Sequence, residues 1–326
     1  MDYELVSRQF LRALRGKRSQ VAFARRLRFR SNVAHAWETG RNAPTAAQTL
    51  WVAQRAGIDV REALHRFYRN PPAWLASVDP VSSACVARLL CDLQGRTPVV
   101  EVARSSGLSR FAVARALAGQ AEPRLPDFLR IVEATSLRAL DWIAAFVDPA
   151  QLPALRVQWK QLEAARNAGY DEPWTLGVIR ALELEAYRTS TRPAPGWVAK
   201  RLGIPLEVEA RCLALLEASG LIRFDDKRKR YRIVAGAALD ARRDPERAKS
   251  LRKWWGERAL ERFGEGDDRI FSYNVFGISE RDYQRLRELH RAYFQELRTI
   301  VAASQPVERV VLANVQLIGL DEGSSL

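Results

Sequence analysis

The stretch from Ser19 to Pro44 constrains the fold of this chain more than any other. Ser19 is suited to cap a helix, and the apolar residues after it are spaced for a short one. A turn at Arg28–Arg30 then leads to a second helix, from about Ser31 to Thr39, which Gly40 ends. We expect the first helix to turn Val21, Phe23, Ala24 and Leu27 inward. Two short helices joined by a tight turn, with a basic tail, predict a helix-turn-helix.

The same pattern returns 79 residues later in the chain. The matched positions include Gly40 with Gly119, Pro44 with Pro123, Ile58 with Leu137, Leu64 with Ile143 and Phe67 with Phe146. Because the correspondence continues past the helix-turn-helix, the repeat predicts two tandem copies of a complete small helical domain.

The first copy also resembles a known family. The residues that carry the resemblance are Gln20, Ala24, the run Trp37-Glu38-Thr39-Gly40 and the tail Arg41-Asn42-Ala43-Pro44. They are similar to the Cro and lambda-repressor type of helix-turn-helix, often called the xenobiotic-response-element family, over about Phe10 to Phe67. In that family the second helix enters the major groove of DNA, and the glutamine that opens the first helix holds a phosphate.

Carried over by position, the resemblance implies that Gln20 contacts the DNA backbone and that Ser31, Asn32 and His35 face bases. We add Arg25, Arg30, Arg41 and Asn42 to the predicted DNA-binding residues of this copy. The turn departs from the family pattern, because Arg28-Phe29-Arg30 stands where Gly-Val-Ser or a similar run is usual. A residue other than glycine must therefore take the left-handed conformation, at some cost in strain.

The second copy keeps the Gly107-Leu108-Ser109 turn but has Pro98-Val99 where Ser19-Gln20 stands in the first. Its exposed recognition positions are expected to hold Arg110, Phe111 and Arg115, of which the two arginines are suited to DNA. Two roles remain open for this copy: contact with DNA, or packing and dimerisation.

The formal net charge of +14 is unevenly spread along the 326 residues. Residues 1–80 hold 14 Lys and Arg against 6 Asp and Glu, whereas residues 81–150 hold 8 against 7. A concentrated positive field attracts polyanions and supports nucleic-acid binding by counterion release. The alternative is a composition that simply supplies many solvated arginines.

Several other classes of protein find little support in the sequence. Three cysteines, Cys85, Cys91 and Cys212, lack zinc-site spacing, so we expect reduced core thiols and neither a metal nor a cofactor. The histidines have no neighbour suited to orient a base, and no phosphate-cradling or nucleophile motif occurs, so we expect no enzyme. No apolar run is long enough for a membrane span or a signal peptide, which predicts a cytoplasmic protein with no membrane association.

The region after Pro149 begins with a helical connector that extends to about Thr191. Residues 197–234 then resemble a winged helix, with a hairpin turn at Asp225–Arg230. The basic hairpin could lie along a DNA backbone or be a solvated tip, whereas Glu207 and Glu209 would repel phosphates.

The last third predicts a helix over 244–263, an extended segment 270–278, an amphipathic helix 279–303 and a strand 308–320. Together, about residues 155–320 resemble the domain of unknown function of an uncharacterised bacterial helix-turn-helix regulator family. We expect four parts: residues 1–70 and 78–148, the two copies; 149–240, the connector and winged helix; and 241–326, for dimerisation or sensing.

These observations predict a mostly α protein in which two tandem repressor-like helix-turn-helix domains are followed by a winged helix plus a small α/β C-terminal domain. The predicted function is a sequence-specific, dimeric transcriptional regulator that binds double-stranded DNA. The C-terminal domain is a candidate site for an unidentified effector or protein partner. The alternative is a protein–protein interaction scaffold of helical repeats with non-specific DNA affinity.

Overall fold

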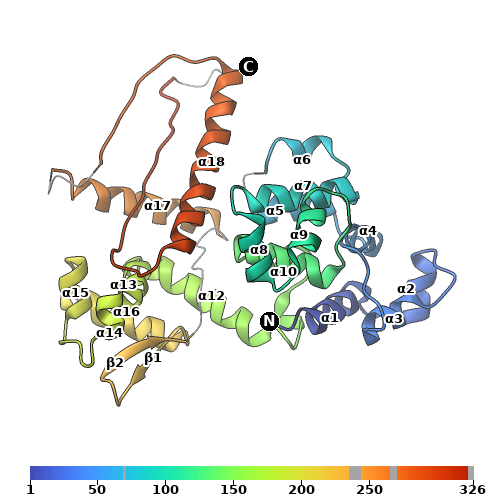
Figure 1. Ribbon diagram of the computed structural model, residues 1–326, viewed down its shortest axis with the longest axis horizontal. Coiled ribbons are helices and arrows are strands. Elements are labelled where there is room, and N and C mark those ends of the chain that lie inside the picture. The colour runs from blue at the N-terminus through green and yellow to red at the C-terminus, as the bar shows by residue number, and fades with distance from the viewer. Residues whose placement is uncertain (69–70, 235–243, 265–269, 322–326) are drawn as a thin grey trace. The chain divides into compact units, whose positions relative to one another are not determined.

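The computed structural model describes residues 1–68, 71–234, 244–264 and 270–321, and it is mostly helical (Figure 1). It divides into two compact units, Met1–Lys160 and Gln161–Leu326. The predicted domain boundaries at residue 70 and at residues 240 and 241 fall outside the described residues. Within the described part of the chain, no helix is long and apolar enough to cross a membrane.

The first unit is built from two sets of helices, coloured blue to green in Figure 1. The first set is α1 (Tyr3–Arg15), α2 (Gln20–Arg26), α3 (Val33–Thr39), α4 (Ala46–Ala56) and α5 (Val60–Tyr68). The second set is α7 (Ser83–Gln94), α8 (Val99–Ser106), α9 (Arg110–Leu117), α10 (Leu125–Ser136) and α11 (Ala139–Phe146). The short α6 (Trp74–Ser77) lies between the sets, and the 3-10 helix η1 (Pro149–Gln151) follows them. A shift of 79 residues lays each helix over its counterpart to within two residues at either end.

The capping residues explain where the helices of the first copy begin and end. The Ser19 hydroxyl accepts a hydrogen bond from Ala22 N at 3.1 Å, and Gly40 ends α3 in the left-handed conformation with φ +80°. One predicted inward residue is wrong, because the side chain of Val21 is 47% exposed. The inward stripe of α2 has helical spacing and consists of Gln20, Phe23, Ala24 and Leu27.

The two sets of helices share one hydrophobic core. α5 packs on α11, α1 packs on α10, and α4 packs on α7, so each set covers apolar faces of the other. The ring centre of Phe10 in α1 lies 5.5 Å from that of Trp142 in α11, and the ring centres of Trp142 and Phe146 are 4.8 Å apart. All three side chains are buried in the cluster that extends from Val6 to Leu155. The two predicted domains are therefore halves of one folded body.

The second unit packs around its own core. Its elements are α13 (Trp174–Glu183), α14 (Glu185–Thr189), α15 (Trp197–Leu202), α16 (Leu206–Ala218), β1 (Ile222–Asp225), β2 (Arg230–Ile233), α17 (Pro245–Leu260) and α18 (Glu280–Ala303), and α12 (Arg156–Asp171) leads into it. The strands β1 and β2 form an antiparallel hairpin at the predicted place. The indole rings of Trp254 and Trp255 lie edge-on to Trp174 at 5.5 and 5.4 Å. These two tryptophans thus pack within the chain.

The predicted small α/β C-terminal domain is not formed. The helices α17 and α18 match the predicted ones, with Asp244 and Ser279 as their N-caps, but residues 270–278 and 308–320 form no strand. Two segments with strand-like apolar patterns do not make a sheet unless their backbones pair with each other or with another strand. Here many of their side chains face solvent, among them Ile270, Tyr273, Val275 and Val311, which are 93%, 94%, 73% and 77% exposed.

The three cysteines differ in burial. Cys85 and Cys212 are buried, and burial raises the pKa of their thiols to about 11 and about 12. Cys91 is exposed, and its thiol donates to Leu117 O at 2.9 Å, so the expectation of a core thiol is wrong for this residue.

Candidate nucleic-acid interface

The turn of the first predicted helix-turn-helix has the strain that the sequence implies. Arg28 takes the left-handed conformation with φ +59°, and its counterpart 79 residues later, Gly107, has φ +70°. Both copies thus place a left-handed residue at this position, although only the second has a glycine there. The turns still differ in length, because α3 starts at Val33, two residues later than the position that corresponds to the start of α9 at Arg110. The turn is anchored by Phe29, whose ring lies edge-on to Trp37 at 5.8 Å and to Trp51 at 6.0 Å.

Exposed basic side chains are dense along α1–α3 and the loops next to these helices. Residues 12–44 contain nine Lys and Arg and a single acidic residue, Glu38. The exposed basic side chains are Arg12, Lys17, Arg18, Arg25, Arg26, Arg28, Arg30 and Arg41. The one carboxylate of the stretch, that of Glu38, forms an ion pair with Arg15. Within residues 12–44 the eight exposed cations therefore have no exposed carboxylate among them.

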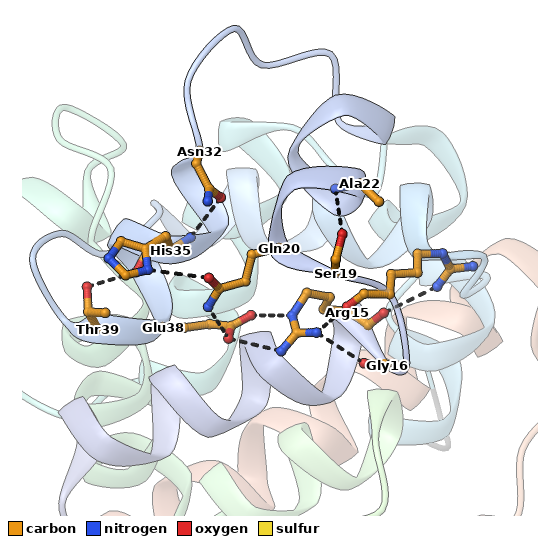
Figure 2. Close-up of polar contacts among 10 residues, drawn as sticks. Arg15, Gly16, Ser19, Gln20, Ala22, Asn32, His35, Glu38 and Thr39 are labelled. Atoms are coloured by element: carbon orange, nitrogen blue, oxygen red, sulfur yellow. Dashed lines mark hydrogen bonds and ion pairs between the residues drawn. The ribbon is translucent and has the colours of Figure 1, made fainter.

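Glu38 holds the three helices of the predicted reader together. Its carboxylate accepts from Arg15 Nε at 2.5 Å, from Arg15 Nη2 at 3.1 Å and from Gln20 Nε2 at 2.9 Å (Figure 2). Gln20 Oε1 in turn lies 3.3 Å from His35 Nδ1. Burial alone would raise the pKa of Glu38, but the bonds from Arg15 and Gln20 outweigh it and hold the pKa below its ordinary value. The four side chains tie α1, α2 and α3 into one block.

Asn32 occupies a cap position. Its Oδ1 accepts from His35 N at 3.2 Å, so α3 begins at Val33 instead of near Ser31. The side chain remains exposed beside Ser31, at the N-terminal end of the helix. A bidentate bond to adenine uses both amide atoms, so it would compete with this cap.

The predicted site residues of the first copy fall into two groups. Arg25, Arg30, Ser31, Asn32, Arg41 and Asn42 are exposed. Gln20 and His35 are half-buried, and their side chains face each other. The predicted contacts of these residues with DNA remain predictions.

The second copy presents a smaller polar set. Arg110, Phe111 and Arg115 are all exposed on α9, and the Phe111 ring is 72% exposed. The Arg115 guanidinium lies 5.6 Å from the centre of that ring. This arrangement offers two cations and one aromatic face on the helix that corresponds to α3.

Sequence reasoning missed the ion pair of Arg15 with Glu38 and the part played by Arg124. Arg124 Nη1 donates to Asn42 Oδ1 at 2.5 Å and also to Ala43 O, so it connects the second copy with the loop after α3. A signal existed for the first, since Glu38 is the lone acidic residue in a run of nine basic ones.

In the second unit, Glu209 does not face solvent as a repelling charge. It is 8% exposed and accepts from Ala199 N at 2.8 Å, which joins α16 to α15.

At the hairpin, Asp225 Oδ1 accepts from Lys227 N and Arg228 N at 3.1 and 3.2 Å. The pKa of Asp225 is lowered mainly by the hydrogen bond from Arg228 N, and the positive charge of Arg232 lowers it further. These bonds shape the hairpin tip, whose basic side chains are exposed at Lys227–Lys229.

Comparison with known proteins identifies one part of the chain. Residues 155–320 match a family model described as Domain of unknown function (DUF4423), which agrees with the predicted resemblance of this region. No curated protein and no solved structure matches the chain. The similarity of residues 10–67 to the Cro and lambda-repressor type therefore rests on the residues quoted above.

Proposed function

The chain belongs to the family described as Domain of unknown function (DUF4423), and on the chemistry of its other half we propose that it is a sequence-specific DNA-binding transcriptional regulator. The observation that carries the proposal is the set of exposed basic side chains along α1–α3 and the loops next to them. Eight Lys and Arg side chains between Arg12 and Arg41 are exposed, and the only carboxylate of residues 12–44 is paired with Arg15. Each such cation that neutralises a phosphate releases a condensed counterion, which favours binding.

The exposed N-terminal end of α3 supports sequence-specific contact. Ser31, Asn32 and the flanking Arg30 are short or flexible polar groups able to bond base edges in the major groove. The block formed by Arg15, Gln20 and Glu38 would hold α3 at a fixed angle to α1. A rigid support of this kind favours recognition, because it lowers the conformational entropy lost on binding.

Two finer assignments belong to the same proposal. The order α15, α16, β1, β2 supports a winged helix whose hairpin carries exposed Lys227, Arg228 and Lys229. A homodimer through about residues 244–320 is supported by the exposed apolar side chains of 270–278 and 308–320, which a second copy could cover. Trp254 and Trp255 are not part of this argument, since they pack on Trp174 within the chain.

The second candidate function is a scaffold that docks a protein partner through its helical repeats. Phe111 at 72% exposed and Val100 at 52% exposed favour it, because exposed apolar side chains on neighbouring helices are suited to protein contact. A scaffold of this kind would bind DNA only through the salt-dependent term that is blind to sequence.

Selection of bound duplexes from a random DNA pool by the full chain tests the proposal. A regulator should enrich one defined motif, to which it binds at least 1,000-fold more tightly than to random DNA, the order expected for specific readers. A pool that stays random after several rounds, with affinity set by salt alone, would favour the scaffold.

A pair of variants then tests the assigned base contact. Asn32→Ser keeps a side chain that can cap α3 but removes the amide that bonds adenine, so it should weaken binding to the selected motif about 5- to 150-fold, from about 1–3 kcal/mol. Binding to random DNA should not change. Gln20→Ala, which removes a predicted phosphate contact, should weaken binding to both DNAs. Equal losses on the two DNAs with Asn32→Ser would contradict the assignment.

A further inference from the structure

The loops that follow α3 and α9 meet each other in an antiparallel bridge. Thr45 pairs with Arg124, which is its own counterpart in the 79-residue repeat. The two hydrogen bonds run from Ala46 N to Pro123 O and from Leu125 N to Pro44 O, each 2.9 Å long. Exchanging the two copies turns either bond into the other. A pseudo-two-fold axis therefore passes through the bridge and relates the two copies within one chain.

The rest of the contact between the copies follows the same symmetry. α5 packs on its own counterpart α11, and the packing of α1 on α10 is matched by that of α7 on α4. Arg66 Nη2 donates to Ala145 O at 2.8 Å, and these two residues are also 79 apart. The shared core lies between the same helices. This is the form of an isologous dimer interface, built once within a single chain.

We propose that one chain is an internal dimer that binds a single DNA site with two unequal halves, α3 contacting one half and α9 the other. The inference rests on the proposed function, since it needs DNA as the ligand, and it adds what kind of site is bound and by how many chains. A duplex has two-fold axes perpendicular to its length, so a protein with such an axis can place equivalent helices in successive major grooves.

The position of the bridge agrees with this use. α3 ends at Thr39, six residues before Thr45, and α9 ends at Leu117, seven residues before Arg124. A chain reaches at most about 3.6 Å per residue, so both helix ends lie within about 25 Å of the axis. Half-sites one helical turn apart have their centres about 17 Å from the axis between them. The loops are thus short enough to hold both helices at half-site distance.

The chemistry of α9 is suited to a half-site different from that of α3. Arginine bonds guanine in the major groove, and an aromatic ring contacts the methyl group of thymine. Arg110 and the 72% exposed Phe111 supply these groups, whereas the corresponding end of α3 supplies Ser31 and Asn32. Because the two helices present different groups, the bound motif should lack two-fold symmetry in its bases.

The first test joins motif selection to stoichiometry, using the full chain. The enriched motif should have two dissimilar halves, and titration of a duplex carrying one motif should saturate at one duplex per chain, whether or not chains associate. Arg110→Ala should relax base preference in one half only, and Arg30→Ala in the other half only. A palindromic motif that saturates at two chains per duplex would overturn the inference but keep the proposed function. Failure to enrich any motif would overturn the proposed function, and the inference with it.

The second test locks the bridge covalently. A pair such as Thr45 and Arg124, not joined directly by backbone hydrogen bonds, has Cα atoms about 4.5 Å apart, which a disulfide can span. The variant Thr45→Cys/Arg124→Cys, made with Cys91→Ser so that no native exposed thiol competes, should form an intrachain bond on mild oxidation. The oxidised form should bind the selected motif within about twofold of its own reduced form. Loss of binding on oxidation, with recovery on reduction, would show that the copies must separate to bind DNA and would overturn the inference.

Discussion

Residues 12–44 and 91–123 form the same three helices with very different chemistry. The first stretch holds nine basic residues and one acidic residue, whereas the second holds four basic and three acidic residues. The residues that tie the first block together, Arg15, Gln20, His35 and Glu38, correspond to Gln94, Val99, Ala114 and Leu117 in the second. One copy thus links its three helices through half-buried polar groups, whereas three of the four corresponding residues of the other copy are apolar.

At three positions of the shared core the second copy has the larger side chain. It places Leu125, Phe128 and Trp142 where the first copy has Ala46, Thr49 and Ala63, and all six are buried. The comparison shows how a duplicated unit can divide two tasks. The first copy carries the positive charge that a DNA ligand would need, and the second supplies the large side chains at these three core positions.

The largest expected effect comes from removing the central ring of the shared core. Trp142→Ala should destabilise the first unit by about 4 kcal/mol, because the ring is buried and its loss leaves a large cavity. Hydrogen exchange followed by mass spectrometry should show protection falling together in α1–α5 and in α7–α11. Trp197→Ala, at a half-buried ring that packs on the core of the other unit, is the control. Loss of protection confined to α7–α11 would mean that the two copies are folded independently.

Charge reversal tests the unequal surfaces of the two copies. Arg25→Glu with Arg41→Glu should weaken DNA binding about 100-fold and lower the salt slope by about 2, as expected for two lost phosphate contacts. Arg110→Glu with Arg115→Glu should weaken binding about 10-fold, because these cations stand in a nearly neutral copy. Fluorescence anisotropy, measured at salt concentrations from about 50 to 200 mM, gives the affinity and the salt slope of each variant. Counterion release has a strong effect on affinity over about this range. Equal losses would contradict the division of tasks.

Replacing Glu38 by the residue of the second copy tests the polar block. Glu38→Leu should destabilise α1–α3 by about 2 kcal/mol, because it leaves the half-buried Arg15 and Gln20 without their acceptor. The triple variant Arg15→Gln/Gln20→Val/Glu38→Leu carries the complete set of the second copy and should recover most of that loss. Exchange protection of α1–α3 peptides reports both changes, and a triple variant no more stable than the single one would argue against equivalent blocks.

Acid should act on the same block in a defined direction. The pKa of Glu38 in the folded chain lies below 4.5, its ordinary value. The stability that its carboxylate contributes is therefore fully present above about pH 4.5 and is lost as the pH falls through the lower folded value. The triple variant lacks this carboxylate, so its α1–α3 protection should depend less on pH in that range. Identical pH profiles for the unchanged protein and the triple variant would show that Glu38 does not cause the pH dependence.

The smallest effect concerns the turn. Arg28→Gly should stabilise the first copy by about 1 kcal/mol, since glycine takes φ +59° without the strain that a side chain brings. Gly107→Ala should cost about the same in the second copy, where a Cβ would meet no atom within 4 Å and strain alone acts. Thermal unfolding of the two variants checks the opposite signs. The same sign for both would indicate that the two turns are not equivalent.

Local features of this fold were predictable from the sequence, because caps and turns are set by neighbouring residues. Ser19, Gly40 and Ser279 mark helix ends where predicted, and Arg28 takes the expected left-handed conformation. The repeat predicted which helices correspond. It could not predict that they pack together, since the approach of Phe10 to Trp142 joins residues far apart in the chain.

The site was predictable only as a set of exposed charges. Glu38 is the lone acidic residue in a basic stretch, but nine cations lie in that stretch and Arg15 is 23 residues away, so the sequence did not indicate which cation would pair with it. Segments 270–278 and 308–320 have strand-like side-chain patterns, but such a pattern does not specify which strand would pair with their backbone groups. Whether a partner exists depends on the rest of the assembly.

The bridge between Thr45 and Arg124 also affects how such a protein can change over generations. In a dimer of identical chains, one altered codon changes the readers of both half-sites at once, so a new operator must change in both halves together. On the proposed function, the two predicted readers, α3 and α9, are encoded 79 residues apart in one gene. Each would then be able to acquire a new base preference singly, while the other would keep its contact with its own half-site.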